Sequence, residues 1–202
     1  MSVCQSGEIC KGSKHLLIDG HWQFCTCYYL ERRERWFREG GFPSAYEGID
    51  IETAATGSLY KVSLTRCKAA LKFLFATPKE ILFFRNLGAE TMPIASWFAW
   101  NAALFQPVFL CSVRDMVDDA FTEDQRGRKL KRAKSKRVFL VLRIGHEVKH
   151  SWNTSFLIDL VNERLAMNAP TVISVAHPLT QSLESIYGAS VIAAILERSF
   201  SL

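Results

Sequence analysis

The chain has 202 residues, of which 49% are hydrophobic and 22% charged, and its formal net charge is +5. This composition excludes a disordered chain and suits one well-buried globular domain with a small appendage. The charge excess is compatible with an anionic partner but does not define one, so the distribution of charge along the chain matters more.

The first 40 residues contain four of the six cysteines. The opening stretch MSVCQSGEIC lacks the basic start and hydrophobic core of a signal peptide, so we expect a cytoplasmic, reducing location where metal binding is favoured over disulfides. Four thiolates suit a structural zinc ion, although the Cys-x5-Cys and Cys-x-Cys spacings are irregular and His15 or His21 could replace the first cysteine. The predicted ligands are Cys4, Cys10, Cys25 and Cys27, and the alternative is a tail with free thiols.

Aromatic and basic residues follow within the same segment. A zinc-folded knuckle would carry Trp22, Phe24 and Tyr28, which could pack on the core, a partner protein or a nucleic-acid base. The stretch YYLERRERWFREGG then alternates arginine with glutamate, which predicts an exposed helix with spaced ion pairs. We therefore assign residues 1–40 to a zinc module with its following helix, 41–60 to a linker, and 61–202 to a core domain.

From residue 61 onward, helical and strand patterns alternate. Leu64, Cys67, Leu71 and Leu74 lie on one helical face, and EILFF, PVFLC, VFLVL and TVISVA are short apolar strand candidates. Ser112 is predicted to cap a helix with Asp115 at its third position. The helical stripe of that segment consists of Val113, Met116, Val117, Ala120 and Phe121. Further helices are predicted over residues 94–105, 156–167 and 189–200. This alternation predicts an α/β fold with a parallel sheet covered by helices on both faces.

Residues 91–113 carry no charged side chain and are long enough to cross a membrane. Pro93, Asn101 and Pro107 interrupt the stretch, however, and Pro107 suits a boundary between a helix and a strand. A buried helix followed by a buried strand explains the pattern better, so we expect no membrane contact. Cys67 and Cys111 fall on helix and strand patterns and are predicted to be core residues without catalytic roles.

The most distinctive stretch is RGRKLKRAKSKR, which has eight basic residues among twelve and no acid. We expect a mobile, self-repelling loop suited to phosphate contacts, with a solvated loop or a clamp on neighbouring acids as the alternative. Stacking rings would also be needed for single strands, and Trp152 is a candidate. The predicted nucleic-acid-binding residues are Arg126, Arg128, Lys129, Lys131, Arg132, Lys134, Lys136 and Arg137.

The order and spacing of these stretches resemble the AAA+ domain of bacterial and phage replicative-helicase loaders and of the related helper ATPases of transposition. The resemblance runs from about Phe42 to Phe200. It includes GFPSAYEGIDIET with Pro43 and Tyr46, the segment VFLCSVRDMVDDAF, and the segment FLIDLVNERLAMNAPTVIS. The last of these contains Asn162, Arg164, Pro170 and Thr171. The resemblance implies a P-loop NTPase-like core. As we interpret it, the resemblance also requires the third strand of the sheet to lie between the first and the fourth.

The same resemblance exposes a degenerate nucleotide site. A phosphate-binding loop needs glycines for its backbone N–H groups, a lysine for the terminal phosphates and a hydroxyl for magnesium. In register, only Gly88 remains of the glycines, Thr91 stands for the lysine and Met92 for the hydroxyl. The positions of two glycines hold Arg85 and Glu90. We therefore expect neither ATP nor magnesium as a cofactor.

Other parts of the mechanism are missing too. The acidic pair expected at the end of the third strand is replaced by Arg143 and Ile144, while His146 and Glu147 lie just beyond it. Ala176 stands where a polar sensor would be, and Ala194 stands near the place of the arginine finger. The chain also stops after the fourth predicted strand, which would leave an exposed sheet edge available for self-association.

These features predict a non-enzymatic, helicase-loader-like accessory protein of DNA replication, encoded by a phage or mobile element. It would be a pseudo-ATPase that binds a replicative helicase or another AAA+ protein, and single-stranded DNA. One alternative is a transposition or recombination adaptor that binds a transposase and duplex DNA. Another is a loader with residual ATP binding, since much of phosphate binding depends on the loop backbone.

Overall fold

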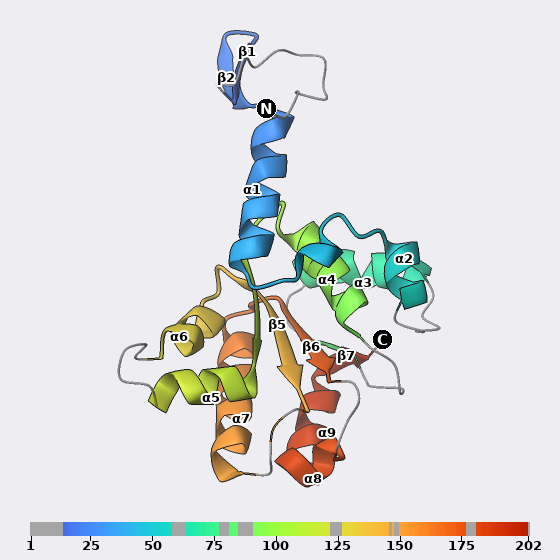
Figure 1. The fold of residues 1–202 in the computed structure, drawn as a ribbon, viewed down its shortest axis with the longest axis vertical. Coiled ribbons are helices and arrows are strands. Elements are labelled where there is room, and N and C mark those ends of the chain that lie inside the picture. Colours follow the sequence, from blue (N-terminus) through green and yellow to red (C-terminus); the bar gives the residue numbers. More distant parts are fainter. Residues whose placement is uncertain are drawn as a thin grey trace.

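The structure is a computed structural model, and it describes residues 14–57, 64–76, 81–84, 91–121, 127–145, 147, 150–176 and 181–201. A five-stranded parallel sheet lies at its centre, with the order β4-β5-β6-β3-β7. The strands are β3 (Ile81–Phe84), β4 (Val108–Ser112), β5 (Phe139–Ile144), β6 (Thr171–Val175) and β7 (Ser199–Ser201). The predicted α/β architecture is therefore confirmed (Figure 1).

Helices cover both faces of the sheet. One face carries α2 (Ile51–Gly57), α3 (Leu64–Ala76) and α4 (Met92–Ala102), and the other carries α5 (Val113–Phe121), α6 (Arg128–Lys134), α7 (Ser151–Ala166), α8 (Leu183–Tyr187) and α9 (Ala189–Glu197). Alternate residues of β5 enter the two cores: Phe139 and Val141 pack towards α4, whereas Leu140 and Leu142 pack on the opposite face. A strand buried on both faces is continuously apolar for this reason.

Two expectations about the sheet are wrong. The chain does not stop after a fourth strand, because Ser199–Ser201 form β7, which pairs in parallel with β3 and covers the edge that we expected to be exposed. The fourth core strand, β6, lies between β5 and β3, so the third strand is not between the first and fourth. Apolar patterns identify strands, but they do not fix their lateral order.

The first described residues form an arm that projects from this core (Figure 1). An antiparallel hairpin of β1 (His15–Ile18) and β2 (His21–Phe24) precedes the long helix α1 (Thr26–Glu39). The end of α1 meets the outer strand β4, where Leu110 N donates to Gly40 O at 2.8 Å. A Cβ at Gly40 would lie 2.6 Å from the carbonyl oxygen of Val108, so only glycine allows this approach.

Residues 41–60, which we expected to be a linker, contain the short helix η1 (Ser44–Tyr46) and α2. Phe42, Ile51 and Ala54 belong to the same buried cluster as α4, so these residues pack against the core. The uncharged stretch divides as predicted into a buried helix, α4, and the strand β4. None of the helices in the described ranges is both long and apolar enough to cross a bilayer.

Candidate functional site

The basic stretch folds as a helix, contrary to our expectation of a mobile loop. Gly127 precedes α6 with a left-handed φ of 67°, and Lys129 N donates to the buried carboxylate of Asp119 at 2.8 Å. Ala133 is fully buried, and Leu130 packs against the cluster beneath the helix. The hydrogen bond from Lys129 N to Asp119 and the burial of Ala133 and Leu130 therefore offset the repulsion among the positive charges of α6.

The basic side chains of this segment divide into two groups. Three are held: Lys134 pairs with Glu163 at 2.6 Å, Lys129 lies 3.9 Å from Asp115, and Arg132 sits over the ring of Phe109. Four are not, because no ion pair joins them to another described residue and all four are exposed: Arg128, Lys131, Lys136 and Arg137. Arg126, the remaining predicted residue, lies outside the described residues. These four exposed side chains therefore keep their positive charge without an ion-paired carboxylate in the described part of the chain.

A buried arginine fixes the end of α6. Arg164 of α7 is fully buried, and its guanidinium donates to the carbonyl oxygens of Ala133, Ser135, Val138 and Pro170 and to the hydroxyl of Thr171. These contacts join α7 to the residues between α6 and β5. Burial lowers the pKa of Arg164 to about 10, so the side chain remains charged at neutral pH. Arg164, Pro170 and Thr171 belong to the stretch that resembles the loaders, but no periodicity in the sequence indicates this network.

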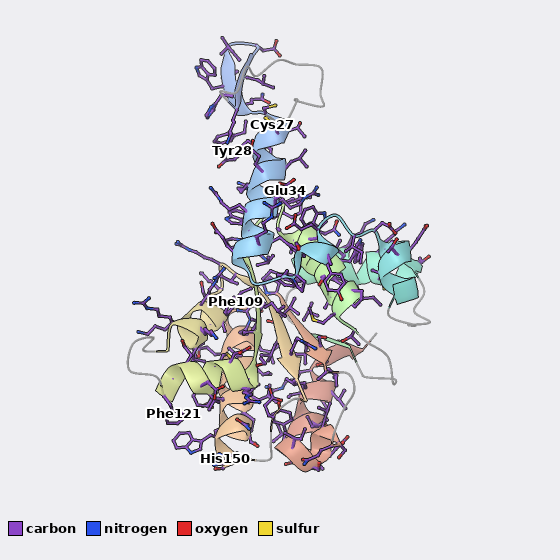
Figure 2. All side chains as sticks on the ribbon, viewed as in Figure 1. Cys27, Tyr28, Glu34, Phe109, Phe121 and His150 are labelled. Carbon is purple, nitrogen blue, oxygen red and sulfur yellow. The ribbon has the colours of Figure 1, made fainter. Side chains whose placement is uncertain are left out.

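Two aromatic rings are exposed on α5 and α7, the helices that pack against α6. Phe121, the last residue of the predicted helical stripe, ends α5 and is 64% exposed. Trp152 in the first turn of α7 is 52% exposed. Their ring centroids lie 5.7 Å apart in an edge-to-face arrangement. They border a groove that His150 and Arg114 also line. Figure 2 labels Phe121 and His150 on this part of the molecule. Rings that remain open to solvent in this way are suited to stacking with a flat ligand.

The carboxyl edge of the sheet would hold nucleotide in an ATPase of this fold. Arg85, Gly88 and Glu90 lie outside the described residues. Thr91 is fully buried, and its hydroxyl donates to the carbonyl of Val175 at 3.1 Å. Its oxygen lies 2.5 Å from the hydroxyl oxygen of Ser174, which is then the donor of that contact because Thr91 has one proton to give. Met92 is also buried.

The two positions expected for acidic residues lie on opposite faces of β5. Ile144 is fully buried in the cluster beneath α7. Arg143 pairs in register with Ser112 on one side and Ser174 on the other. The Nε of Arg143 is buried, and it has no hydrogen-bond partner within the described ranges. A guanidinium at this place offers positive charge, whereas a magnesium site requires negative charge.

Glu147 serves a different purpose from the missing acids. It is buried, accepts hydrogen bonds from Gly145 N at 2.7 Å and Arg114 N at 3.3 Å, and receives the hydroxyl of Tyr187 at 2.5 Å. Burial, reinforced by the negative charge of Glu147, raises the pKa of Tyr187. The carboxylate thus joins α5, the end of β5 and α8, a role that sequence reasoning missed. His146 lies outside the described residues.

The zinc site stays a prediction. Cys4 and Cys10 lie outside the described residues, while Cys25 is buried and Cys27 half-buried beside the start of α1. Within the described ranges, no three residues of the metal-binding types cluster. Measuring the zinc content of the purified protein would test the site directly. Cys67 and Cys111 are buried as predicted, and burial raises the pKa of Cys111 to about 12, which keeps its thiol protonated.

The parallel sheet with helices on both faces is an α/β fold that is shared with two solved structures of low sequence identity. In particular, the chain is similar to the crystal structure of the DnaC helicase loader, with 18% identity over 75% of this chain and 98% of that chain and a TM-score of 0.50. It is equally similar to the crystal structure of DnaI, with 18% identity over 77% of this chain and 94% of that chain and a TM-score of 0.51. No family model and no curated protein matches the sequence. The likeness is therefore one of fold.

Proposed function

We propose that this protein is a helicase-loader-like accessory protein of DNA replication that works by binding and not by ATP hydrolysis. Its partners in this proposal are single-stranded DNA and a replicative helicase or another AAA+ protein. The fold shared with the DnaC helicase loader supports the class of function. At the carboxyl edge of the sheet, Thr91 is hydrogen-bonded to residues at the end of β6, and Arg143 stands where an acidic residue is expected. Both observations support the loss of ATP hydrolysis.

One observation carries the DNA-binding part of the proposal: the basic helix α6 packs against α5 and α7, the two helices that carry the exposed aromatic pair. Phosphates would contact Arg128, Lys131, Lys136 and Arg137, which have no competing carboxylate among the described residues. Bases would stack on Phe121 and Trp152. Charge supplies affinity without sequence preference, and stacking favours single strands, whose base faces are accessible.

Replacing all four exposed basic residues with alanine should weaken binding of a fluorescein-labelled oligothymidine strongly. Each phosphate contact contributes about 0.7 to the slope of log affinity against log salt for a single strand, so the slope should fall by about 3. Fluorescence anisotropy over a series of salt concentrations measures both quantities. Replacement of Trp152 with alanine should lower affinity and leave the slope unchanged, because stacking releases no counterions.

The matched control removes charge from the other face of the core. Lys68 and Lys72 are exposed on α3, and replacing both with alanine should leave affinity and slope nearly unchanged. An unaltered slope in the four-alanine variant would refute the assignment of α6. Competition with duplex DNA separates the rival function, since a transposition or recombination adaptor should prefer the duplex.

Thermal unfolding with and without ATP and magnesium tests the pseudo-ATPase assignment. A ligand that binds only the native state raises its stability according to the ratio of its concentration to its dissociation constant. We expect no magnesium-dependent rise in the unfolding temperature at millimolar ATP and no release of phosphate. A rise with magnesium would instead favour a loader with residual ATP binding.

A further inference from the structure

The arm formed by the β1–β2 hairpin and α1 carries a row of stacked planar groups. Phe24 lies against the ring of Tyr28, with ring centroids 4.2 Å apart and an interplanar angle of 15°, and it meets Tyr29 edge to face at 6.2 Å. The guanidinium of Arg32 continues the row, because its central carbon lies 5.0 Å from the centre of the Tyr29 ring and 4.6 Å from that of Trp36. The row therefore runs from the hairpin along α1 towards the core.

Several rings of this row are open to solvent. Trp22 is 72% exposed, Phe24 46% and Tyr29 38%. Trp22 and Phe24 are two positions apart on β2, so their side chains share one face of the hairpin and Trp22 extends the row to the outer end of the arm (Figure 1). Rings that are held by their neighbours and still exposed provide a platform on which unpaired bases can stack.

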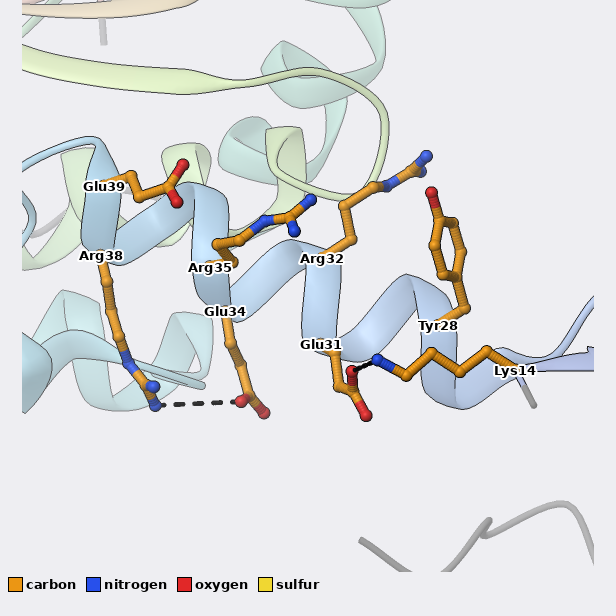
Figure 3. Close-up of a pocket in the computed structure, with 8 residues that line it drawn as sticks. All are labelled: Lys14, Tyr28, Glu31, Arg32, Glu34, Arg35, Arg38 and Glu39. Atoms are coloured by element: carbon orange, nitrogen blue, oxygen red, sulfur yellow. Dashed lines mark hydrogen bonds and ion pairs between the residues drawn. The ribbon is translucent and has the colours of Figure 1, made fainter. Parts of the chain in front are cut away.

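Positive charge accompanies this row along α1. Figure 3 shows Arg32 and Arg35 on the side of the helix that faces away from Glu31 and Glu34. Those two acids already lie near basic groups of the arm, at 2.5 and 3.8 Å. Glu39 is the one acid of α1 on the side of the two arginines. Neither Arg32 nor Arg35 forms an ion pair with a carboxylate in the part of the chain that the structure describes, so this side keeps an excess of positive charge.

The loop between α4 and β4 places another exposed ring at the base of the arm. Arg32 donates from Nη2 to the carbonyl oxygen of Leu104 at 2.7 Å, and the next residue, Phe105, is 70% exposed. The backbone of this loop is held in place, since Leu104 N donates to Asn101 O at 3.3 Å and Phe105 N donates to Ala102 O at 2.9 Å. The ring of Phe105 is therefore presented to solvent beside the arm by an ordered turn.

The same loop meets the residues that follow α6. Pro107 O accepts a hydrogen bond from Phe139 N at 2.8 Å. Arg137, one of the four exposed basic residues of the candidate site, is two positions before Phe139, and Phe105 is two positions before Pro107. Both side chains are thus attached at the amino edge of the sheet. Phe105 lies between the basic segment and the row of planar groups on the arm.

We propose that a single DNA strand bound at α6 continues past Phe105 and along the arm, where its bases stack on Tyr29, Phe24 and Trp22. The arginine side of α1 contacts its phosphates. This inference rests on the DNA-binding part of the proposed function and extends it by a second contact segment. A single strand is the appropriate ligand, because stacking requires unpaired bases and arginine contacts the backbone without regard to sequence. The arm thus lengthens the binding site without adding a sequence preference.

Strand length tests this path by fluorescence anisotropy of the full chain with labelled oligothymidines. Single folds that bind single strands cover about 4–16 nucleotides, so a strand of about 10 nucleotides can be held at α6, whereas one of about 30 nucleotides also reaches the arm. Phe105→Ala, and Trp22→Ala combined with Phe24→Ala, should each weaken binding of the longer strand at least about fivefold, the lower end of what one stacked base contributes. Binding of the shorter strand should stay unchanged in both variants.

The matched control separates stacking from general apolar contact. Leu17 is 59% exposed and pairs with Trp22 across the hairpin, but it has no ring on which a base can stack. Leu17→Ala should therefore leave the affinity for both strands unchanged. Trp152→Ala on α7 should weaken binding of both strands, because that ring belongs to the site on the core. Circular dichroism confirms that each variant is folded.

The inference and the proposed function fail in different ways. If alanine at the four exposed basic residues around α6 abolishes binding while the arm variants bind the longer strand as the wild type does, the arm is not a DNA contact although α6 is. An equal loss in Leu17→Ala and in the variant without Trp22 and Phe24 would also overturn the inference, since it would indicate an apolar surface for a protein partner. If the wild type binds neither strand, the proposed DNA binding is itself wrong.

Discussion

Replacing Arg164 with methionine should destabilise the protein by about 3–5 kcal/mol, because several buried hydrogen-bond acceptors lose their donor at once. Methionine fills most of the volume but donates no hydrogen bond. The carbonyl oxygens of Ala133, Ser135 and Val138 would then lose a buried donor, and Thr171 would lose a donor 2.6 Å from its hydroxyl. A buried acceptor without a partner costs about 1–3 kcal/mol. Urea unfolding followed by tryptophan fluorescence measures the change.

The region of the protein that loses stability in Arg164→Met is as informative as the size of the change in unfolding free energy. Because Arg164 holds the residues after α6, its removal should also increase hydrogen exchange in α6 and weaken DNA binding at temperatures where the core is still folded. Arg198→Met is the matched control, since Arg198 is exposed and makes one hydrogen bond to Asn162. That control should change stability by about 0.5 kcal/mol or less. A loss below about 1 kcal/mol for Arg164→Met would contradict the assigned role.

Local sequence patterns predict those helices and strands whose structure depends on residues close together in the chain. The apolar run of β5 predicts a strand buried on both faces, and the structure places it at that position. The predicted cap of α5 forms in both directions, with Ser112 N donating to Asp115 at 3.0 Å and Asp115 N donating to Ser112 Oγ at 3.0 Å. Such contacts lie within four residues and need no tertiary information.

Features that depend on distant residues could not be predicted in the same way. The three residues of β7 have no strand pattern of their own, and pairing with β3, more than 100 positions earlier, makes them a strand. The helix α6 needs Asp119 and the cluster beneath Leu130 to overcome its own repulsion. Phe121 meets Trp152 only after α5 and α7 pack on the same face of the sheet. The candidate site consists mainly of contacts of this second kind.

The residue that replaces the lysine of the phosphate-binding loop has a structural role that its identity alone does not reveal. From the sequence, Thr91 is only a residue that cannot do the work of a lysine, whereas in the structure it connects two elements of the fold. It joins the amino end of α4 to the end of β6 through two buried hydrogen bonds over a separation of more than 80 residues. The position therefore contributes to folding. Restoring the residue of an active loop at this position would remove an interaction as well as add a group.

Replacing Thr91 with lysine should accordingly destabilise the fold by about 3–5 kcal/mol without creating an ATPase. The new ammonium would be placed at a fully buried position, and the hydroxyl of Ser174 and the carbonyl of Val175 would lose their partner. Thr91→Ser keeps the hydroxyl and removes one methyl group, so it should cost only about 1 kcal/mol. Urea unfolding of the three proteins, with ATP binding measured on each, distinguishes the two effects. If the lysine variant had wild-type stability and bound ATP with magnesium, the edge would be an intact phosphate site that lacks only its cation, and the pseudo-ATPase assignment would be wrong.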